Sequence, residues 1–111
     1  MKTKSLLIAA GSLLLLNSTA FAQSISAYKD TKNNVWITGL QASTTYEIKD
    51  VLTNGVPSTL HSLTNSCGQA EVRQAVGKYQ SLTVEGVTFN ISSLPSKVHQ
   101  RCNPMHPNPN G

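Results

Sequence analysis

The chain has 111 residues, of which 39% are hydrophobic and 13% charged, with two cysteines and a formal net charge of +4. This length is enough for one domain with one modest core but not for two, so we expect a single domain. Two of its nine basic residues lie at the N-terminus, so seven bases against five acids leave +2 from residue 23 onward. These seven are scattered singly rather than clustered with aromatics, so we expect no nucleic-acid partner.

Residues 1–22 are predicted to be a cleavable signal peptide. Two lysines precede the apolar run Leu6–Leu16, which is shorter than the roughly 20 residues of a membrane span. Ala20 and Ala22 are the small residues that a signal peptidase requires, so we expect cleavage between Ala22 and Gln23. No later apolar run is long enough to cross a membrane. The sequence therefore predicts a secreted or periplasmic protein.

Residues 23–102 are predicted to form a single β domain, because short β-branched and aromatic runs alternate with Gly, Asn, Pro and Ser. The predicted strands are Ile25–Lys29, Val35–Thr38, Thr44–Leu52, Ser58–Leu63, Ala70–Val76, Gln80–Glu85, Val87–Ser92 and Lys97–Arg101. Turns are expected at Asn33-Asn34, Asn54-Gly55, Cys67-Gly68, Gly77 and Leu94-Pro95. Ala70–Val76 also fits the helical period, so a helix stays open there.

Alternating apolar residues indicate which side chains of the predicted strands point into the core. They are Thr44, Tyr46 and Ile48 in one strand, Leu82 and Val84 in a second, and Val87, Phe89 and Ile91 in a third. The pattern is typical of a β-sandwich or a β-barrel rather than of helices.

The stretch from Thr38 to Ile48 resembles the tyrosine corner of fibronectin type III domains, in which a Leu precedes a Tyr by six residues. By this resemblance Tyr46 is the corner Tyr, its hydroxyl bonds back to the backbone, Leu40 is its partner and Trp36 lies in the core. Ala42 stands where these domains usually have Pro, and 65 residues follow Tyr46. Pattern and resemblance together predict a small antiparallel β-sandwich of the immunoglobulin or fibronectin type III kind.

The two cysteines, Cys67 and Cys102, are expected to form a disulfide, because an exported chain meets an oxidising compartment. Closing a loop of this length removes denatured-state entropy worth about 4 kcal/mol.

The tail 103–111 contains three prolines and is predicted to be extended and disordered. Met105 and His106 follow Cys102, and these three residue types bind copper, yet their spacing matches no ligand pattern and Cys102 is expected in the disulfide. We therefore expect no metal and no cofactor. His61 is expected on the exposed side of a strand and His99 near the disulfide, both without a special role.

No catalytic pattern is found: the chain has no Gly-x-Ser-x-Gly elbow, paired acids, His-Glu-x-x-His helix or phosphate loop. Glu47 and Asp50 are close in sequence, but an offset of three residues places them on opposite faces of a strand. The protein is therefore expected not to be an enzyme. Tyr28 and Tyr79 have polar neighbours and are the candidate surface binding residues, while Trp36 is either a core residue or a stacking platform.

These observations favour an exported, non-enzymatic binding or structural module at the cell envelope or outside the cell, with a protein or glycan partner. One alternative is a subunit of a surface fibre in which Ser24–Lys29 is donated as a strand to a neighbouring copy, so self-association is also left open. A second alternative is a small secreted inhibitor or effector that uses a disulfide-braced loop, Val76–Ser81.

Overall fold

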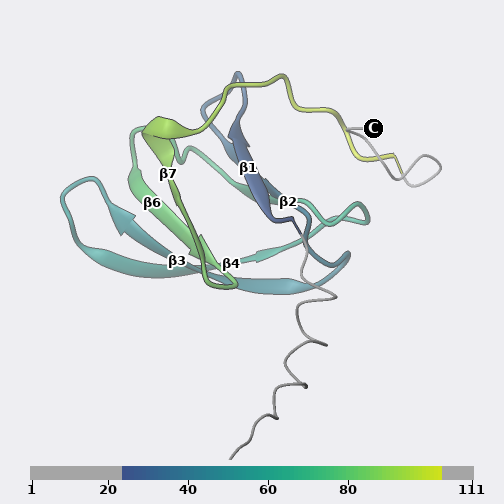
Figure 1. The fold of residues 1–111 in the computed structure, drawn as a ribbon, viewed down its shortest axis with the longest axis horizontal. Coiled ribbons are helices and arrows are strands. Elements are labelled where there is room, and N and C mark those ends of the chain that lie inside the picture. The colour runs from purple at the N-terminus through teal and green to yellow at the C-terminus, as the bar shows by residue number, and fades with distance from the viewer. Residues whose placement is uncertain (1–23, 104–111) are drawn as a thin grey trace, which may run out of the picture.

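The computed structural model describes residues 24–103, which form two antiparallel β-sheets packed face to face (Figure 1). The first sheet has the order β1-β2-β5, with β1 at Ser26–Lys29, β2 at Val35–Thr38 and β5 at Ala70–Val72. The second has the order β4-β3-β6-β7, with β3 at Thr45–Leu52, β4 at Pro57–Leu63, β6 at Tyr79–Val84 and β7 at Val87–Asn90. A 3-10 turn, η3, spans Ile91–Ser93. The predicted small antiparallel β-sandwich is confirmed.

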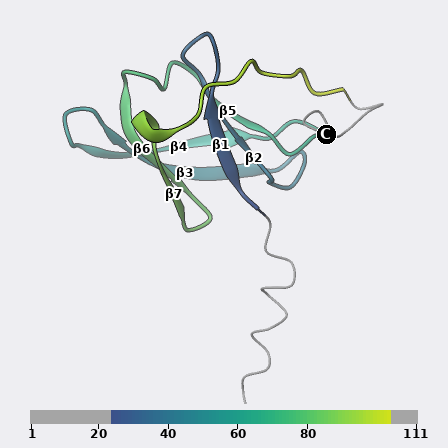
Figure 2. The same cartoon turned by 45° about the horizontal axis from the view of Figure 1, so that its top comes forward.

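The chain crosses between the two sheets after β2, after β4 and after β5 (Figure 2). Each predicted strand that falls in these sheets begins within one residue of its expected position. The predicted strand Ala70–Val76 is too long, because strand pairing stops at Val72. Gln74 takes a φ of +52°, and the carbonyl of Ala75 accepts the N–H groups of the following turn. The helical alternative for this segment is also wrong.

The predicted strand Lys97–Arg101 is a second correction. None of these five residues joins a strand, and Ser96 just before them forms a single parallel bridge to Lys29 at the edge of β1. Lys29 donates its N–H to the carbonyl of Pro95 over 2.8 Å, and Lys97 donates to the carbonyl of Lys29 over 2.8 Å. The segment therefore leaves the edge of β1 after this bridge, and residues 97–101 run on without strand pairing.

The core lies between the sheets. Alternation predicts its members Ile48, Leu82, Val84 and Ile91, whereas the predicted inward set does not include Val35 and Ile37. Its largest fully buried members are Val35, Ile37, Ile48, Leu82 and Val84. Tyr46 and Phe89 are half-buried against this cluster, and Ile91 is buried within it. The expectation for Val87 is wrong: its side chain is 36% exposed, because β7 begins there directly after a tight turn at the rim of the sheet.

The local tyrosine corner is confirmed. The hydroxyl of Tyr46 accepts a hydrogen bond of 3.0 Å from the N–H of Gln41, and Leu40 is buried. The implied core position of Trp36 is wrong, because its neighbours Val35 and Ile37 fill the core and alternation turns Trp36 to the opposite face.

Three predictions lie outside the described residues: the signal peptide at 1–22, its cleavage between Ala22 and Gln23, and the tail beyond Asn103 with Met105 and His106. Within residues 24–103 no helix is long and apolar enough to cross a membrane.

Candidate functional site

The outer face of the first sheet carries a row of three large side chains. Strand register aligns Tyr28 of β1 with Trp36 of β2, and Trp36 with Glu71 of β5. Residues directly opposite one another in an antiparallel pair share a face, so this row points away from the core. The C-terminal segment 94–103, called the strap below, passes over this sheet as the yellow-green end of the ribbon (Figure 1).

His99 joins the strap to this row. Its imidazole stacks on the indole of Trp36 with 3.6 Å between ring centroids and 4° between planes. Its Nδ1 atom shares a hydrogen bond of 2.8 Å with the hydroxyl of Tyr28. The Lys97 ammonium lies 5.0 Å from the centre of the Tyr28 ring. The strap is thus held by stacking, one side-chain hydrogen bond and a cation over an aromatic face.

Asp30 organises the loop between β1 and β2. Its Oδ1 accepts the N–H of Lys32 over 2.7 Å and that of Asn34 over 2.9 Å. Its Oδ2 accepts the indole N–H of Trp36 over 2.9 Å and the side-chain amide of Asn34 over 3.2 Å. The turn also needs Asn33 at a φ of +68°, a conformation that Asn tolerates. The carboxylate therefore fixes both the loop and the edge of the indole ring.

The ionisation of these groups follows from their surroundings. The pKa of Asp30 lies below its ordinary value. Burial alone would raise this pKa, but the hydrogen bonds that the carboxylate accepts from the N–H of Asn34, the indole of Trp36 and the N–H of Lys32 have the larger, opposite effect. Burial lowers the pKa of His99, against the opposing charges of Asp30 and Glu71. Burial and the charge of Asp30 raise the pKa of Tyr28. At neutral pH the stack therefore contains an uncharged imidazole beside an ionised Asp30.

A hollow of about 320 Å³ opens beside this stack. Its lining combines two acids, one base, two aromatic rings and small polar groups: Asp30, Thr31, Lys32, Asn34, Trp36, Glu71, Val98 and His99. The Glu71 carboxylate already forms an ion pair within the chain, because the Nε atom of Arg73 lies 3.5 Å from it. That Arg73 side chain is 83% exposed, so it leaves the Glu71 carboxylate accessible to competitors.

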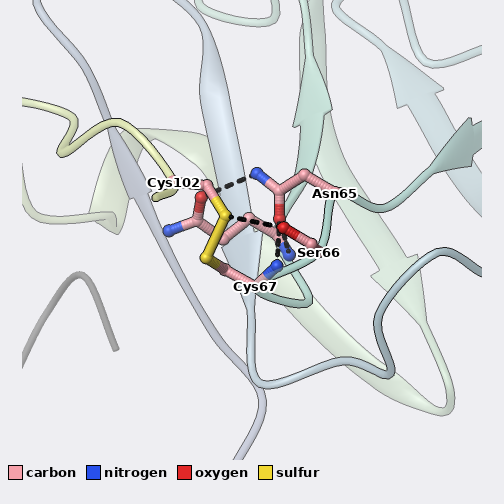
Figure 3. Close-up of a disulfide and its surroundings, with 5 residues drawn as sticks. Asn65, Ser66, Cys67 and Cys102 are labelled. Carbon is pink, nitrogen blue, oxygen red and sulfur yellow. Dashed lines mark hydrogen bonds between the residues drawn. A yellow bond between two sulfur atoms is a disulfide. The ribbon is translucent and has the colours of Figure 1, made fainter. Parts of the chain in front are cut away.

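The predicted disulfide between Cys67 and Cys102 is confirmed and ties the strap to the β4–β5 loop (Figure 3). The Cα atoms are 5.9 Å apart. The loop is shaped by Asn65, whose Oδ1 accepts the N–H groups of Cys67 and Gln69, each over 3.0 Å. Gly68 has a φ of +75°, and a Cβ there would collide with the Leu40 carbonyl, so the loop fits closely against the β2–β3 connection.

The two candidate binding tyrosines lie on different sheets and are not brought together. Tyr28 is only 4% exposed, so the expected surface position of its ring is not met; the strap covers it. Tyr79 begins β6 and packs half-buried against the core, at the rim of a second hollow of about 620 Å³. Whether either tyrosine contacts a partner stays a prediction.

His99 and Asp30 are site residues that the sequence did not single out. His61 is exposed on β4, as expected for an isolated histidine. In the sequence His99 is an isolated histidine as well, yet in the structure its ring is stacked on Trp36 within the site. No spacing pattern links it to Trp36, since the two are far apart in the chain, and only the return of the strap brings them together.

Glu47 and Asp50 do point to opposite faces of β3: Glu47 is exposed and Asp50 is 2% exposed inside the core. Neither carboxylate oxygen of Asp50 has a hydrogen-bond partner among the described residues. Across residues 24–103, no group of three or more His, Cys, Asp or Glu side chains is placed to hold a metal ion.

Comparison of the chain with protein-family models, with curated proteins and with solved structures found no match.

Proposed function

We propose that this protein is an exported, non-enzymatic binding module, and that the hollow beside Trp36 is the site where its partner binds. The observation that carries this proposal is the lining of that hollow. An indole, an imidazole and two carboxylates converge there from the β1–β2 region, β5 and the strap. Concave sites with aromatic walls and a few fixed polar groups are typical of ligand recognition.

The hydrogen bonding of the polar groups supports binding rather than catalysis. Both oxygens of Asp30 are engaged by N–H donors, and Nδ1 of His99 is engaged by Tyr28. A general acid or base must be able to exchange a proton with a substrate, whereas these groups hold the walls of the hollow in place. A site held in place before binding loses little entropy when a ligand enters.

The disulfide supports export. Disulfides persist in oxidising compartments, and Cys67–Cys102 joins the strap that forms one wall of the site to the rest of the domain. Together with the leader predicted at residues 1–22, this supports action in the periplasm, at the cell envelope or outside the cell.

The ligand group that fits the hollow best is a positively charged side chain or amine on a protein partner. Glu71 already pairs with Arg73 at its outer side, and an incoming cation replaces that exposed contact. One face of the Trp36 indole is covered by His99, which leaves no open stacking surface for a sugar on that face. We therefore propose that the ligand is a basic peptide rather than a glycan.

Trp36 is the only tryptophan of the chain, so its fluorescence reports on this site alone. We expect its emission to change saturably with a short Lys/Arg-rich peptide, and not with a matched Asp/Glu-rich peptide or a neutral oligosaccharide. Glu71→Gln is expected to weaken binding of the basic peptide by about tenfold, because it removes the accessible charge.

Arg73→Gln provides the matched control with opposite sign. It removes the internal competitor and should tighten binding of the basic peptide, while leaving the fold unchanged because the side chain is exposed. An emission that no peptide alters, or equal affinity in both variants, would refute the cation site. A response to the oligosaccharide alone would instead favour a glycan as the ligand.

The placement of the other two candidate segments favours neither alternative function. Ser26–Lys29 is paired with β2 in its own sheet, so donating Ser24–Lys29 to a neighbour requires that pairing to break. The segment Val76–Ser81 lies beyond the end of β5 opposite to Cys67, and its last three residues belong to β6. The disulfide therefore does not brace it directly.

A further inference from the structure

The two sheets have four edge strands, and β4 differs from the other three. The strand β1 has only four residues, and the strap bridges its edge at Lys29 through Ser96. The strand β5 has three residues and β7 has four, whereas β4 has seven. No charged residue lies within Pro57–Leu63, and its pairing with β3 shows no bulge. It lacks the charges and bulges by which edge strands usually avoid pairing with other chains.

The hydrogen bonds at the two ends of the β3–β4 pair show which backbone groups of β4 are free. Leu52 donates its N–H to the carbonyl of Val56 over 2.8 Å, and Thr64 donates to the carbonyl of Thr44 over 2.9 Å. Since the bonded positions alternate along an antiparallel strand, the even-numbered residues of β4 face β3. The N–H and C=O groups of the odd-numbered residues therefore point outward, away from the sheet.

The free outward stretch runs from Thr59 to Leu63. Pro57 has no N–H, and the N–H of Asn65 is already bonded to the carbonyl of Gln69. Between them, Thr59, His61 and Leu63 are exposed, and no backbone bond outside the strand ladders of residues 24–103 involves them. The Leu63 side chain is 66% exposed at this edge.

We propose that β4 is a self-association edge, at which a second copy of this chain adds its own β4 in antiparallel orientation. Only one two-fold register pairs all three outward residues: His61 faces His61 of the second copy, and Thr59 faces Leu63. That register satisfies every outward N–H and C=O of the three, avoids Pro57, and covers both exposed Leu63 side chains. The result is one continuous eight-stranded sheet across the two copies.

The occupant is a second copy because the edge complements itself. A two-fold axis places the central residue His61 against its own counterpart and brings the flanking residues of the same strand close together, so a charged edge would repel itself, and β4 has no Asp, Glu, Lys or Arg. Three paired residues per chain form a small contact, which belongs to the weak and transient class of interfaces. The hollow beside Trp36 is not part of this edge, so the inference is independent of the proposed binding function.

The test is the mass of the oxidised full-length protein by light scattering and sedimentation from about 10 μM to about 1 mM, a range that spans weak dimers. We expect a concentration-dependent dimer, and amide exchange at Thr59, His61 and Leu63 that slows as the fraction of dimer increases. His61→Pro removes the central outward N–H without removing a bond within the monomer, and should raise the dissociation constant at least about tenfold.

His61→Lys places two like charges across the axis and should have the same effect if the proline variant fails to fold. Asn90→Lys adds the same charge on β7, the opposite edge of the same sheet, and should dimerise like the unaltered protein. A protein that stays monomeric up to about 1 mM overturns the proposal. So does a dimer that both His61 variants leave intact, or one that Asn90→Lys abolishes. Glu71→Gln should leave dimerisation unchanged, which separates this result from the test of the hollow.

Discussion

The two faces of the β1-β2-β5 sheet are covered in different ways. The inner face presents Ala27, Val35 and Ile37, which pack against the second sheet and are at most 7% exposed. The outer face presents Tyr28 and Trp36 and is covered by the strap, ten residues of irregular backbone. The inner face is held by non-directional burial, whereas the outer face depends on ring stacking, hydrogen bonds and a disulfide.

This difference indicates where the molecule is able to open. Segments with few buried apolar contacts open at lower free energy than the core. The strap packs Leu94 against the core, but beyond it Val98 is 70% exposed. Opening of the strap would remove one wall of the hollow without unfolding the sandwich. The predictions below test that separation.

Replacing both cysteines by serine is expected to have the largest effect, a loss of about 4 kcal/mol of unfolding free energy in the chain-entropy account. The closed loop has a sequence separation of 35 and includes β5, β6 and β7, so the effect reaches beyond the strap. Urea denaturation followed by circular dichroism measures it. If instead only the Trp36 fluorescence changes and the urea midpoint of unfolding is unchanged, the disulfide stabilises the outer face alone.

Ile37→Ala and Trp36→Ala compare the two faces at neighbouring positions of one strand. Ile37 is fully buried, so its truncation should cost roughly 2–5 kcal/mol of global stability. Trp36→Ala should cost less, and should instead speed amide exchange along the strap, because it removes the surface on which His99 stacks. Equal losses of global stability in both variants would show that the two faces unfold as one unit.

Asp50→Leu should stabilise the core between the two sheets, to which β3 contributes this side chain. The carboxylate is buried with neither oxygen bonded among the described residues, and an unpaired buried polar group costs roughly 1–3 kcal/mol. Leucine has the same number of side-chain heavy atoms, branched at the same position, and no polar atoms, although its methyl groups are larger than the carboxylate oxygens. Asp50→Asn separates polarity from charge and should give a smaller gain. If the leucine variant is less stable than the parent, Asp50 makes a stabilising interaction in solution.

Acidification should have the smallest effect and should act on the outer face. The folded-state pKa of His99 lies below its ordinary value of about 6.5, so the unfolded chain binds the proton first. The contribution of His99 is therefore complete above that value and is lost as pH falls toward its lowered folded pKa. Thermal unfolding from pH 8 to pH 5 should show a modest decrease that His99→Phe, which keeps a stacking ring, reduces. An unchanged pH profile in that variant would assign the decrease elsewhere.

The sequence by itself determined the class of fold. Alternating apolar residues such as Leu82 and Val84 report on the core because side chains of a strand alternate between its faces. The turn at Asn54-Gly55 and the tyrosine corner at Tyr46 are local, since each depends on residues within a few positions. The disulfide was predictable because only one pairing of two cysteines exists.

Only the tertiary structure decided the sites. Periodicity shows that Trp36 and Val35 face opposite ways but not which face the second sheet covers, and the core position implied for Trp36 was therefore wrong. The partnership of Trp36 with His99 depends on how the strap returns across the sheet, and the free edge of β4 depends on the order of the strands. Such long-range placements arise from the packing of the whole chain, whereas strands and turns are encoded by neighbouring residues.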